Sequence, residues 1–270
     1  MIEFDAVHKE YPDGTVAVDS FSLTVPSHTV VALVGSSGSG KTTLLRMVNR
    51  MVEPTEGSVS IDGVDVRSMD RVKLRRSIGY VLQAGGLLPH RTVADNVATV
   101  PVLQGTSRRQ AKAEALGLLE RVGLDPALAD RYPAQLSGGQ QQRVGVARAL
   151  ASDPNILLMD EPFGAVDPIV RDQLQSEMRS LQADIGKTIL FITHDIDEAF
   201  ALGDEVVVLR TGAEIAQQGT PAEILAAPAD DFVASFVGAG TPHRTLHIRQ
   251  IDGRDVVVDG DDRPTGVLQR

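Results

Sequence analysis

The sequence predicts an α/β fold built around a mostly parallel sheet. Three short, largely apolar runs, Val30–Val34, Asn155–Met159 and Thr188–Thr193, are typical of strands buried on both faces. Segments with apolar residues at helical spacing separate these runs, and this alternation indicates a parallel sheet with helices packed on it. The first run leads directly into a glycine-rich loop that begins at Gly35, and the rest of the chain is organised around that junction.

This loop carries the pattern G-x-x-x-x-G-K-[ST], whose backbone N–H groups wrap the phosphates of a nucleotide. Glycines let the backbone curl around an anion, and the N-terminus of the helix expected over Thr42–Met51 adds partial positive charge. Lys41 is expected to reach the β- and γ-phosphates, and the Thr42 hydroxyl to bind Mg²⁺. The alternative is a turn that binds nothing, but turns rarely combine this spacing with a Lys-Thr pair. The predicted nucleotide-binding residues of the loop are Gly35, Ser36, Ser37, Gly38, Ser39, Gly40, Lys41, Thr42 and Thr43.

Composition excludes several classes of protein. The 270 residues include no Cys, which excludes disulfides and thiolate metal sites and favours a reducing compartment. The net charge of −10 argues against a nucleic-acid partner, because surfaces that bind nucleic acid are usually basic. The N-terminus lacks the pattern of a signal peptide, and no apolar run approaches the roughly 20 residues that span a bilayer. We therefore expect a soluble protein, or one held at a membrane by a partner.

Antiparallel strands are expected beside the parallel core. Alternating segments cover Ile2–Val7 and Val16–Val25, with a Pro-Asp-Gly turn between them, and a hairpin is expected over Gly57–Val66. These pieces predict an antiparallel β-subdomain. The remaining predictions are strands at Ser77–Gln83, Glu205–Leu209 and Glu214–Gln217, the last two as a hairpin, and short helices at Pro221–Ala226 and Asp230–Val237.

Between about residues 88 and 152 the pattern is helical. The segment Ser107–Val122 places its Ala and Leu residues on one face, and Gly123 closes it. Ser137 begins another helix as its N-cap, and the apolar positions of Gln140–Leu150 follow in register. The sequence therefore predicts an inserted helical subdomain.

Two carboxylates follow the second buried strand. Asp160 and Glu161 stand at its carboxyl end, where open α/β folds bind their ligands. Asp160 is expected to hold Mg²⁺, directly or through water, and Glu161 to act as the general base that polarises the attacking water. An acidic pair that caps a helix is the alternative, and it is the weaker interpretation beside a matched phosphate loop.

The stretch Leu136-Ser137-Gly138-Gly139-Gln140 resembles the signature sequence of ABC ATPases, and five further motifs then fall into the order of that family. The resemblance covers about residues 1 to 237 and implies an ABC ATPase fold. The matching positions are Tyr11 for the aromatic that stacks on adenine, Gln83 for the Q-loop, Asp160 and Glu161 for Walker B, Asp167 for the D-loop and His194 for the switch histidine.

The resemblance implies an ATPase that uses ATP and Mg²⁺ and works as a dimer. In the family, the helix end that carries the signature, here Ser137, Gly138, Gly139 and Gln140, caps the γ-phosphate held by a facing copy. Two ATP molecules then lie within a head-to-tail dimer. By the same resemblance, Gln83 senses the γ-phosphate and Mg²⁺ and relays closure to a transmembrane partner, while His194 contacts the γ-phosphate.

Three of these positions also have plainer interpretations. Gln83 could be a simple polar strand end, and Tyr11 could serve in surface packing, which is the commoner use of such an aromatic. Asp167 could cap the helix that is expected to begin beside it. The family role and the capping role of Asp167 are compatible with each other.

A narrower resemblance is carried by residues 86–93, 163–168 and 192–199, which look like ATPase subunits of quaternary-amine importers. Such importers take up glycine betaine, choline, carnitine or proline as osmoprotectants. This implies membrane permeases and a solute-binding protein as partners, and a peripheral position on the cytoplasmic face of the membrane. Importers of other polar solutes such as amino acids share parts of these strings. A soluble ABC ATPase without a permease and an exporter ATPase are the other classes considered.

The last segment, residues 238 to 270, departs from the family pattern. ATPases of this kind often carry two CBS modules after the cassette, and the run Val256–Arg263 followed by Gly266 looks like one hairpin of such a module. The segment is too short for a complete module. A small accessory hairpin or a frayed tail is at least as good an interpretation.

Overall fold

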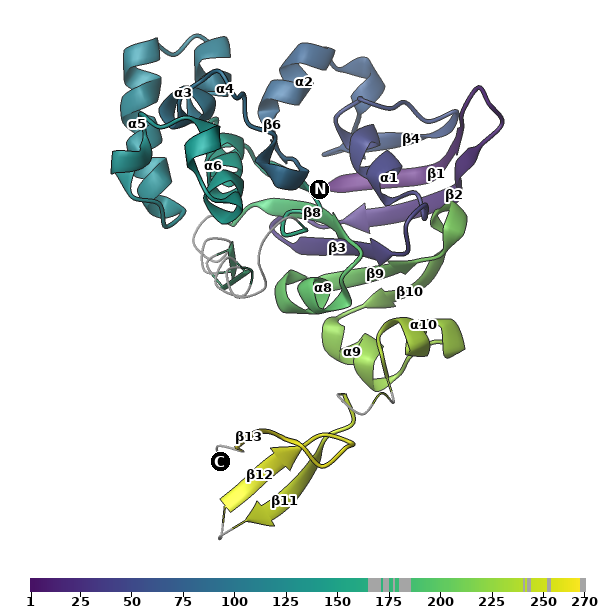
Figure 1. Ribbon diagram of the computed structural model, residues 1–270. Coiled ribbons are helices and arrows are strands. Elements are labelled where there is room, and N and C mark those ends of the chain that lie inside the picture. Colours follow the sequence, from purple (N-terminus) through teal and green to yellow (C-terminus); the bar gives the residue numbers. More distant parts are fainter. Residues whose placement is uncertain are drawn as a thin grey trace.

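The computed structural model describes residues 1–164, 171, 175–176, 178–179, 186–239, 241, 244–251 and 254–267. Within them, a six-stranded sheet with the strand order β10-β9-β3-β8-β7-β6 forms the centre of the molecule (Figure 1). All neighbouring strands run parallel except β10, which pairs with β9 as an antiparallel hairpin. The predicted α/β class with a mostly parallel sheet is confirmed. The strands are β3 (Val30–Gly35), β6 (Ile78–Val81), β7 (Ile156–Asp160), β8 (Thr188–Thr193), β9 (Glu205–Leu209) and β10 (Ile215–Gly219).

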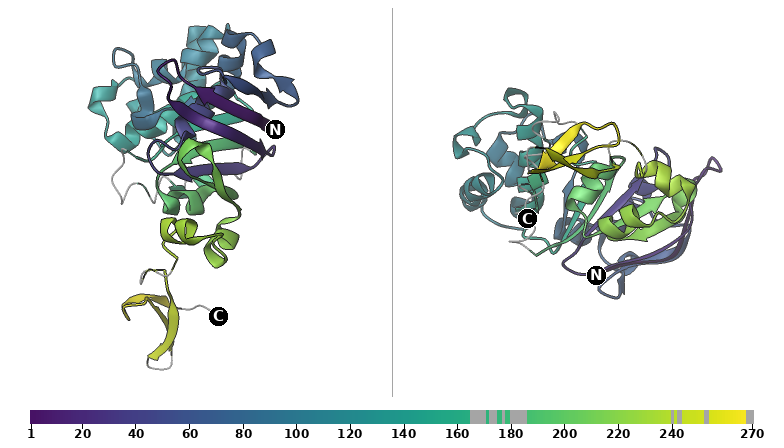
Figure 2. Two further views of the ribbon diagram at one scale, coloured as in Figure 1. Left: turned by 90° about the vertical axis from the view of Figure 1, so that its right-hand side faces the viewer. Right: turned by 90° about the horizontal axis from the view of Figure 1, so that it is seen from below.

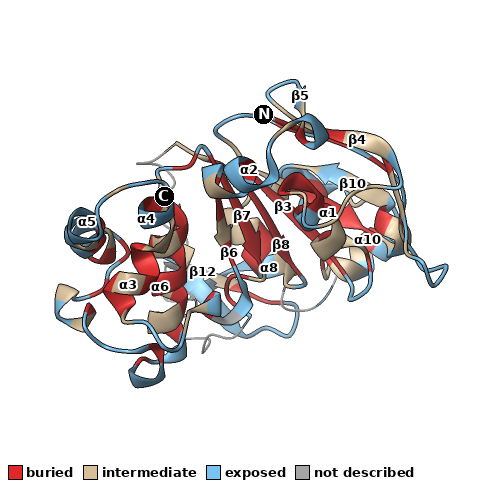
Figure 3. Cartoon of the chain, turned by 90° about the horizontal axis from the view of Figure 1, so that it is seen from above, coloured by how far each residue is buried: buried red, intermediate tan, exposed pale blue. Residues whose placement is uncertain are grey.

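The three central strands are buried because helices cover both faces of the sheet. Every residue of β3, β7 and β8 is buried, and Figure 3 shows these strands in the interior between flanking helices. A strand covered on both faces has no solvent side, so its sequence is apolar without alternation. This is why the three apolar runs could be recognised in the sequence.

One face of the sheet packs on helix α1 (Lys41–Val48), which separates it from a second, antiparallel sheet. Apolar residues of α1, of the second sheet and of one face of the central strands form a single buried cluster. Its aromatic centre is an edge-to-face pair of Phe4 and Phe21 with ring centroids 5.3 Å apart. The predicted antiparallel β-subdomain is thereby confirmed. Its strands, in the order β2-β1-β4-β5, are β1 (Ile2–Glu10), β2 (Val16–Val25), β4 (Glu56–Ile61) and β5 (Val64–Asp65).

Helices of the other face form a second buried cluster with the opposite sides of the same strands. Helices α3 to α6 gather at one end of the sheet, near the edge strand β6 (Figure 1). Among the described residues, no helix combines the length and the apolar character needed to cross a membrane. Besides α1, the described helices are α2 (Arg71–Ser77), α3 (Val93–Val97), α4 (Thr99–Leu103), α5 (Arg108–Arg121), α6 (Gly138–Leu150), α8 (Ile196–Leu202), α9 (Pro221–Ala226) and α10 (Asp231–Phe236). Of these, α2 packs in the cluster of the α1 face through Leu74.

The strand predicted at Ser77–Gln83 is shorter than expected. Ser77 is the last residue of α2, and β6 ends at Val81. Gln83 instead begins a short 3₁₀ helix, η2 (Gln83–Gly86). Gly85 and Gly86 have φ angles of 74° and 52°, a left-handed conformation that turns the chain away from the sheet.

The last described segment is a three-stranded antiparallel sheet that stands apart from the rest of the chain (Figures 1 and 2). It comprises β11 (His247–Ile251), β12 (Arg254–Val258) and β13 (Pro264–Val267). The predicted hairpin corresponds to β12 and β13, whereas β11 was not predicted. Arg244 precedes this sheet and joins it to α8, through an ion pair with Asp197 and a cation–π contact 5.3 Å from the Phe200 ring centroid. The likeness to part of a CBS module stays a prediction.

Removing residues 246–270 is expected to leave the thermal unfolding midpoint within about 2 °C of that of the full chain. Both large apolar clusters are built from residues 2–239, and the truncated chain keeps Arg244 and its contacts with α8. Scanning calorimetry of the two proteins measures the difference. A drop of 10 °C would show that the small sheet supports the core.

Candidate functional site

The glycine-rich loop connects the end of β3 to the start of α1 at the carboxyl edge of the central sheet. Gly38 and Gly40 have φ angles of 81° and 89°, which L side chains rarely adopt. A Cβ on Gly40 would also lie 2.5 Å from the carbonyl oxygen of Ala17. Both glycines are therefore required for the loop to curl back over the first turn of α1.

The Lys41 side chain is enclosed by this loop. Its Nζ donates hydrogen bonds to the carbonyl oxygens of Gly35 at 2.6 Å and Ser36 at 2.8 Å, and to Ser39 Oγ at 3.2 Å. Burial lowers the pKa of Lys41, and the negative charge of Glu161 acts in the opposite direction. The ammonium group is thus held inside the curve of the loop, next to the backbone of the glycine-rich loop that would surround an anion.

A cleft of about 310 Å³ opens in front of this loop. Helix α1 begins there without a side-chain cap, so its first N–H groups and its positive dipole end are available to an anion. This arrangement fits the phosphates of a nucleotide, and Thr42 supplies a hydroxyl to the same surface. The cleft is lined by Thr15, Val16, Ala17, Ser37, Gly38, Ser39, Gly40, Lys41, Thr42, Thr43 and Glu161.

Part of this lining was not predicted from the sequence. Val16 and Ala17 begin strand β2 and Thr15 directly precedes it, and all three reach the cleft because the β1–β2 hairpin turns beside the loop. Tyr11, at the other end of that turn, places its hydroxyl 3.4 Å from Thr43 Oγ1. Lys9 Nζ lies 5.2 Å from the centroid of the Tyr11 ring. Tyr11 therefore lies beside the loop, while its stacking on adenine stays a prediction.

Glu161 joins the other two predicted catalytic residues. Its Oε2 accepts a hydrogen bond from Gln83 Nε2 at 3.0 Å, and its Oε1 lies 3.3 Å from His194 Nδ1. Three segments that are distant in the sequence thus meet at one carboxylate, at the edge of the cleft that holds Lys41. The His194 side chain is 62% exposed, so the imidazole next to Glu161 is accessible from solvent.

The backbone at Glu161 is strained, with a φ angle of 44°. A residue other than glycine pays about 1–2 kcal/mol for the left-handed conformation. Two backbone hydrogen bonds hold it: the Glu161 N–H donates to the Ile192 carbonyl at 3.0 Å, and the Gly164 N–H donates to the Glu161 carbonyl at 3.2 Å. Such strain clusters at functional sites, and here it aims the carboxylate at Gln83 and His194.

Asp160 is buried at the end of β7 and faces α1. Tyr80 donates its hydroxyl to Asp160 Oδ2 at 3.4 Å, and Arg46 Nη2 lies 3.9 Å from the same oxygen. Burial raises the pKa of Asp160, while Arg46 and the Tyr80 hydroxyl oppose that shift. Sequence reasoning missed Arg46 and Tyr80, because only the pairing of β6 with β7 brings Tyr80 to this position.

The signature residues lie on a different part of the molecule. Ser137 caps α6, its Oγ accepting the Gln140 N–H at 3.3 Å while Gln140 Oε1 accepts the Ser137 N–H at 3.0 Å. Ser137 and Gly138 are exposed, and Gly139 is buried. Figure 3 shows α6 and α1 on separate sides of the central strands. The predicted N-cap is confirmed, and within one chain this helix end does not line the cleft of the glycine-rich loop.

Helix α6 is firmly attached to the segment that carries Gln83. Arg148 donates from Nη1 to the Gly86 carbonyl and from Nη2 to the Gly85 carbonyl, both at 2.8 Å. A Cβ on Gly145 would lie 3.1 Å from the Cα of Gly85, so the two backbones pack closely. Asp167, the remaining predicted site residue, lies outside the described residues, so its position relative to this site stays a prediction.

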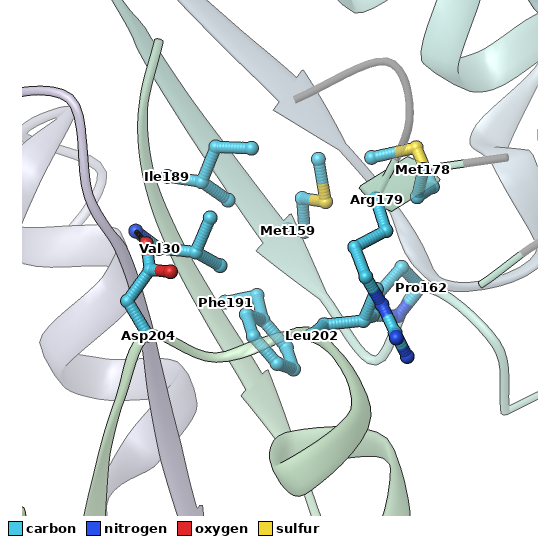
Figure 4. Close-up of a pocket in the computed structure, with 9 residues that line it drawn as sticks. All are labelled: Val30, Met159, Pro162, Met178, Arg179, Ile189, Phe191, Leu202 and Asp204. Atoms are coloured by element: carbon cyan, nitrogen blue, oxygen red, sulfur yellow. Dashed lines mark hydrogen bonds between the residues drawn. The ribbon is translucent and has the colours of Figure 1, made fainter. Parts of the chain in front are cut away.

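A second cavity, of about 230 Å³, lies against the face of the sheet opposite α1 (Figure 4). Its walls are apolar apart from Arg179 and Asp204, and the Asp204 carboxylate already accepts the Val30 N–H at 2.8 Å. It is therefore chemically unlike the cleft of the glycine-rich loop. Its lining consists of Val30, Met159, Pro162, Met178, Arg179, Ile189, Phe191, Leu202 and Asp204.

Comparison with known families and proteins agrees with this geometry. The family model described as ABC transporter matches residues 18–164. The chain is 50% identical over 238 residues to the carnitine transport ATP-binding protein OpuCA of Listeria monocytogenes, covering 88% of this chain and 60% of that protein. It is 49% identical over 238 residues to the glycine betaine uptake system ATP-binding protein YehX of Escherichia coli, covering 88% of this chain and 77% of that protein. The chain thus spans about three fifths of the length of the first of these relatives.

Solved structures show the same fold. The dimeric structure of a bacterial ABC transporter cassette matches with a TM-score of 0.75 and 35% identity, over 82% of this chain and 99% of that chain. The cbiO1 protein from Clostridium perfringens, part of an ABC transporter complex, matches with a TM-score of 0.76 and 28% identity, over 89% and 95%. The fold predicted from the order of the motifs is therefore confirmed.

Lys41→Ala is expected to weaken ATP binding about 10- to 150-fold, because a hydrogen bond to a charged group is worth roughly 1.5–3 kcal/mol. Isothermal calorimetry on the full chain measures this. Lys73→Ala is the matched control, since Lys73 is an exposed lysine on α2 and its loss should leave the affinity unchanged. Equal affinities of wild type and Lys41→Ala would contradict the assignment of the phosphate site.

Proposed function

The chain belongs to the ABC transporter family, and from that premise we propose that it is the ATP-binding and ATP-hydrolysing subunit of an importer. The observation that carries the proposal is the meeting of Gln83, Glu161 and His194 at the rim of the cleft that encloses Lys41. A phosphate-binding loop beside an oriented carboxylate and an accessible imidazole is the equipment needed to cleave a γ-phosphate with water.

Binding of ATP starts at the loop and the first turn of α1. In the structure, Lys41 donates hydrogen bonds to oxygens of Gly35, Ser36 and Ser39. When ATP binds, some of these hydrogen bonds are replaced by hydrogen bonds from Lys41 to the β- and γ-phosphate oxygens. The remaining contacts come from the backbone N–H groups of the loop residues 35–43. Tyr11, beside the turn of the β1–β2 hairpin, is the side chain that we assign to the adenine ring.

Glu161 acts as the general base for the attacking water. Its two carboxylate oxygens are held by Gln83 and His194, so the group is oriented before the substrate arrives. His194 contacts the γ-phosphate and places it in line with the water, and Gln83 senses whether the γ-phosphate and the metal are present. In this division of roles, Gln83 and His194 orient the reacting groups, and Glu161 accepts the proton of the attacking water.

A Mg²⁺ ion fits the donor set at this site. Magnesium is usually held by one or two carboxylates together with substrate phosphates and water. The residues that would hold it are Thr42 through its hydroxyl, Asp160 through its carboxylate and Gln83 through its amide oxygen. When bound, the ion neutralises charge on the phosphate oxygens.

The site is completed by a second copy of the chain. Ser137, Gly138 and Gly139 form the N-terminus of α6, where Ser137 and Gly138 are exposed, and Gln140 supports it through the capping box. None of these residues lines the cleft of its own chain. Such a helix end favours an anion, so it closes over the γ-phosphate held by the facing copy. Asp167 is assigned to this same dimer interface. The neighbour with 35% identity was solved as a dimer, which supports the arrangement.

The solute class proposed is a quaternary-amine osmoprotectant such as glycine betaine, choline, carnitine or proline. The support comes from relatives named for carnitine, choline and glycine betaine transport, at 49–50% identity. The ATPase would act with transmembrane permease subunits and a solute-binding protein, and would reach the cytoplasmic face of the membrane through the permease.

Glu161→Gln is expected to abolish turnover while leaving ATP binding intact, because only the base is lost. The uncleaved ATP should then hold two chains together as a dimer in size-exclusion chromatography with ATP and Mg²⁺. Glu214→Gln makes the same exchange at an exposed site and should keep wild-type turnover. A Glu161→Gln protein that stays monomeric and still hydrolyses ATP would contradict the proposed role.

Ser137→Arg is expected to leave ATP affinity of the isolated chain within about twofold and to prevent the ATP-dependent dimer. A long cation at the exposed helix end blocks the approach of the facing nucleotide site. Ser107→Arg is the matched control, since Ser107 caps α5 in the same way, its side chain accepting the Gln110 N–H. Both variants are compared in the Glu161→Gln background by light scattering, and dimers from both would rule out the signature interface.

The complete importer, reconstituted in vesicles, is expected to hydrolyse ATP severalfold faster when its binding protein carries glycine betaine. Phosphate release is measured with glycine betaine, choline, carnitine and proline in turn, and with an amino acid such as histidine as the comparison. Stimulation by the amino acid alone would contradict the solute class and leave the ATPase assignment intact.

A further inference from the structure

A buried cluster of polar groups lies directly behind His194 and has no part in the chemistry described above. Glu198, on α8, is only 3% exposed, and Thr193, the last residue of β8, is only 1% exposed. The Thr193 hydroxyl donates to Glu198 Oε2 at 2.6 Å, a short hydrogen bond between a hydroxyl and a carboxylate. A carboxylate is seldom buried to this extent unless it is paired, so its position here requires an explanation.

The hydroxyl of Thr193 also fixes the backbone on the C-terminal side of His194. It accepts the Asp195 N–H at 3.0 Å while it donates to Glu198. The Asp195 carboxylate in turn accepts the N–H groups of Asp197 at 2.9 Å and Glu198 at 3.3 Å, and so caps α8. The residues before and after His194 are therefore both fixed, and the imidazole between them projects outward.

Arg171 supplies the counter-charge for this cluster. Its Nη1 donates to Asp195 Oδ2 at 3.1 Å, and its Nε lies 3.6 Å from Glu198 Oε1. Burial raises the pKa of Glu198, and the Thr193 hydroxyl and Arg171 oppose that shift. The cluster thus contains two carboxylates, one guanidinium and one hydroxyl. It links Arg171 to the turn that carries His194.

We propose that Glu198, acting through Thr193, is a positioning residue for His194. The pair fixes the backbone on both sides of His194, so that the imidazole stays 3.3 Å from Glu161 and in reach of the γ-phosphate. This inference rests on the proposed function, because it concerns the residue assigned there to the γ-phosphate. It adds that the side chains behind the imidazole determine how well His194 performs that role.

The test measures ATP-driven dimer formation of the full chain in the Glu161→Gln background. Thr193→Val removes the hydroxyl and keeps the shape of the side chain in its strand. It is expected to raise the ATP concentration for half-maximal dimer about 5- to 10-fold, the effect of losing one hydrogen bond of typical net strength. Thr193→Ser keeps a hydroxyl and should restore the wild-type value, and Glu198→Gln should shift it in the same direction as Thr193→Val.

Adding His194→Ala to each protein distinguishes an effect of Thr193 through His194 from a purely structural effect of Thr193. If Thr193 acts through His194, Thr193→Val has no further effect on dimer formation once the imidazole is gone. Thr188→Val is the matched control, because Thr188 lies at the other end of β8 and its hydroxyl accepts the His28 N–H. Thr188→Val should shift the ATP dependence less than twofold, in either background.

Additive effects of Thr193→Val and His194→Ala would overturn the inference, and so would a Thr193→Ser protein as impaired as Thr193→Val. Failure of the proposed function gives a different result, since the Glu161→Gln protein itself would then form no dimer at any ATP concentration. The outcomes for the inference and for the ATPase assignment are therefore distinguishable.

Discussion

The register of the parallel ladder β3–β8–β7 determines where the groups of the site lie. Val34 pairs with Thr193, and Asp160 pairs with Ile192, so the three strands end at the same level. Whatever follows each strand must then meet at one edge of the sheet: the glycine-rich loop after β3, His194 after β8 and Glu161 after β7. A slip of one residue would exchange the buried faces of a strand, and packing opposes this because each face contacts a different apolar cluster.

The same edge concentrates the strain of the fold. Glu161 adopts a left-handed conformation that a glycine would accept without cost, but a glycine would supply no carboxylate there. Neighbouring elements hold it in place, since its N–H donates to Ile192 of β8 and its carbonyl accepts from Gly164. The orientation of the Glu161 carboxylate therefore depends on the packed sheet as well as on the residue itself.

The two helix N-termini to which phosphate binding is assigned in the proposal lie on separate sides of the central strands. Helix α1 begins at the cleft, while α6 begins at an exposed end on another side of the molecule (Figure 3). Arg148 and the Gly85–Gly145 contact join α6 to the segment of Gln83, and Gln83 contacts Glu161. The start of α6 is thus linked through the Gln83 segment to the Glu161 carboxylate.

The sequence by itself determined the features that depend on neighbouring residues. The loop from Gly35, the N-cap at Ser137 and the apolar strands each follow from local conformational preferences and periodicity. Only the tertiary structure decided which segments meet: Tyr80 and Arg46 at Asp160, the start of β2 along the cleft, and Thr193 with Glu198 behind His194. It also showed that Gln83 begins a 3₁₀ turn and that β11 joins the last hairpin. These contacts depend on strand order and on packing between distant parts of the chain, which local preferences do not specify.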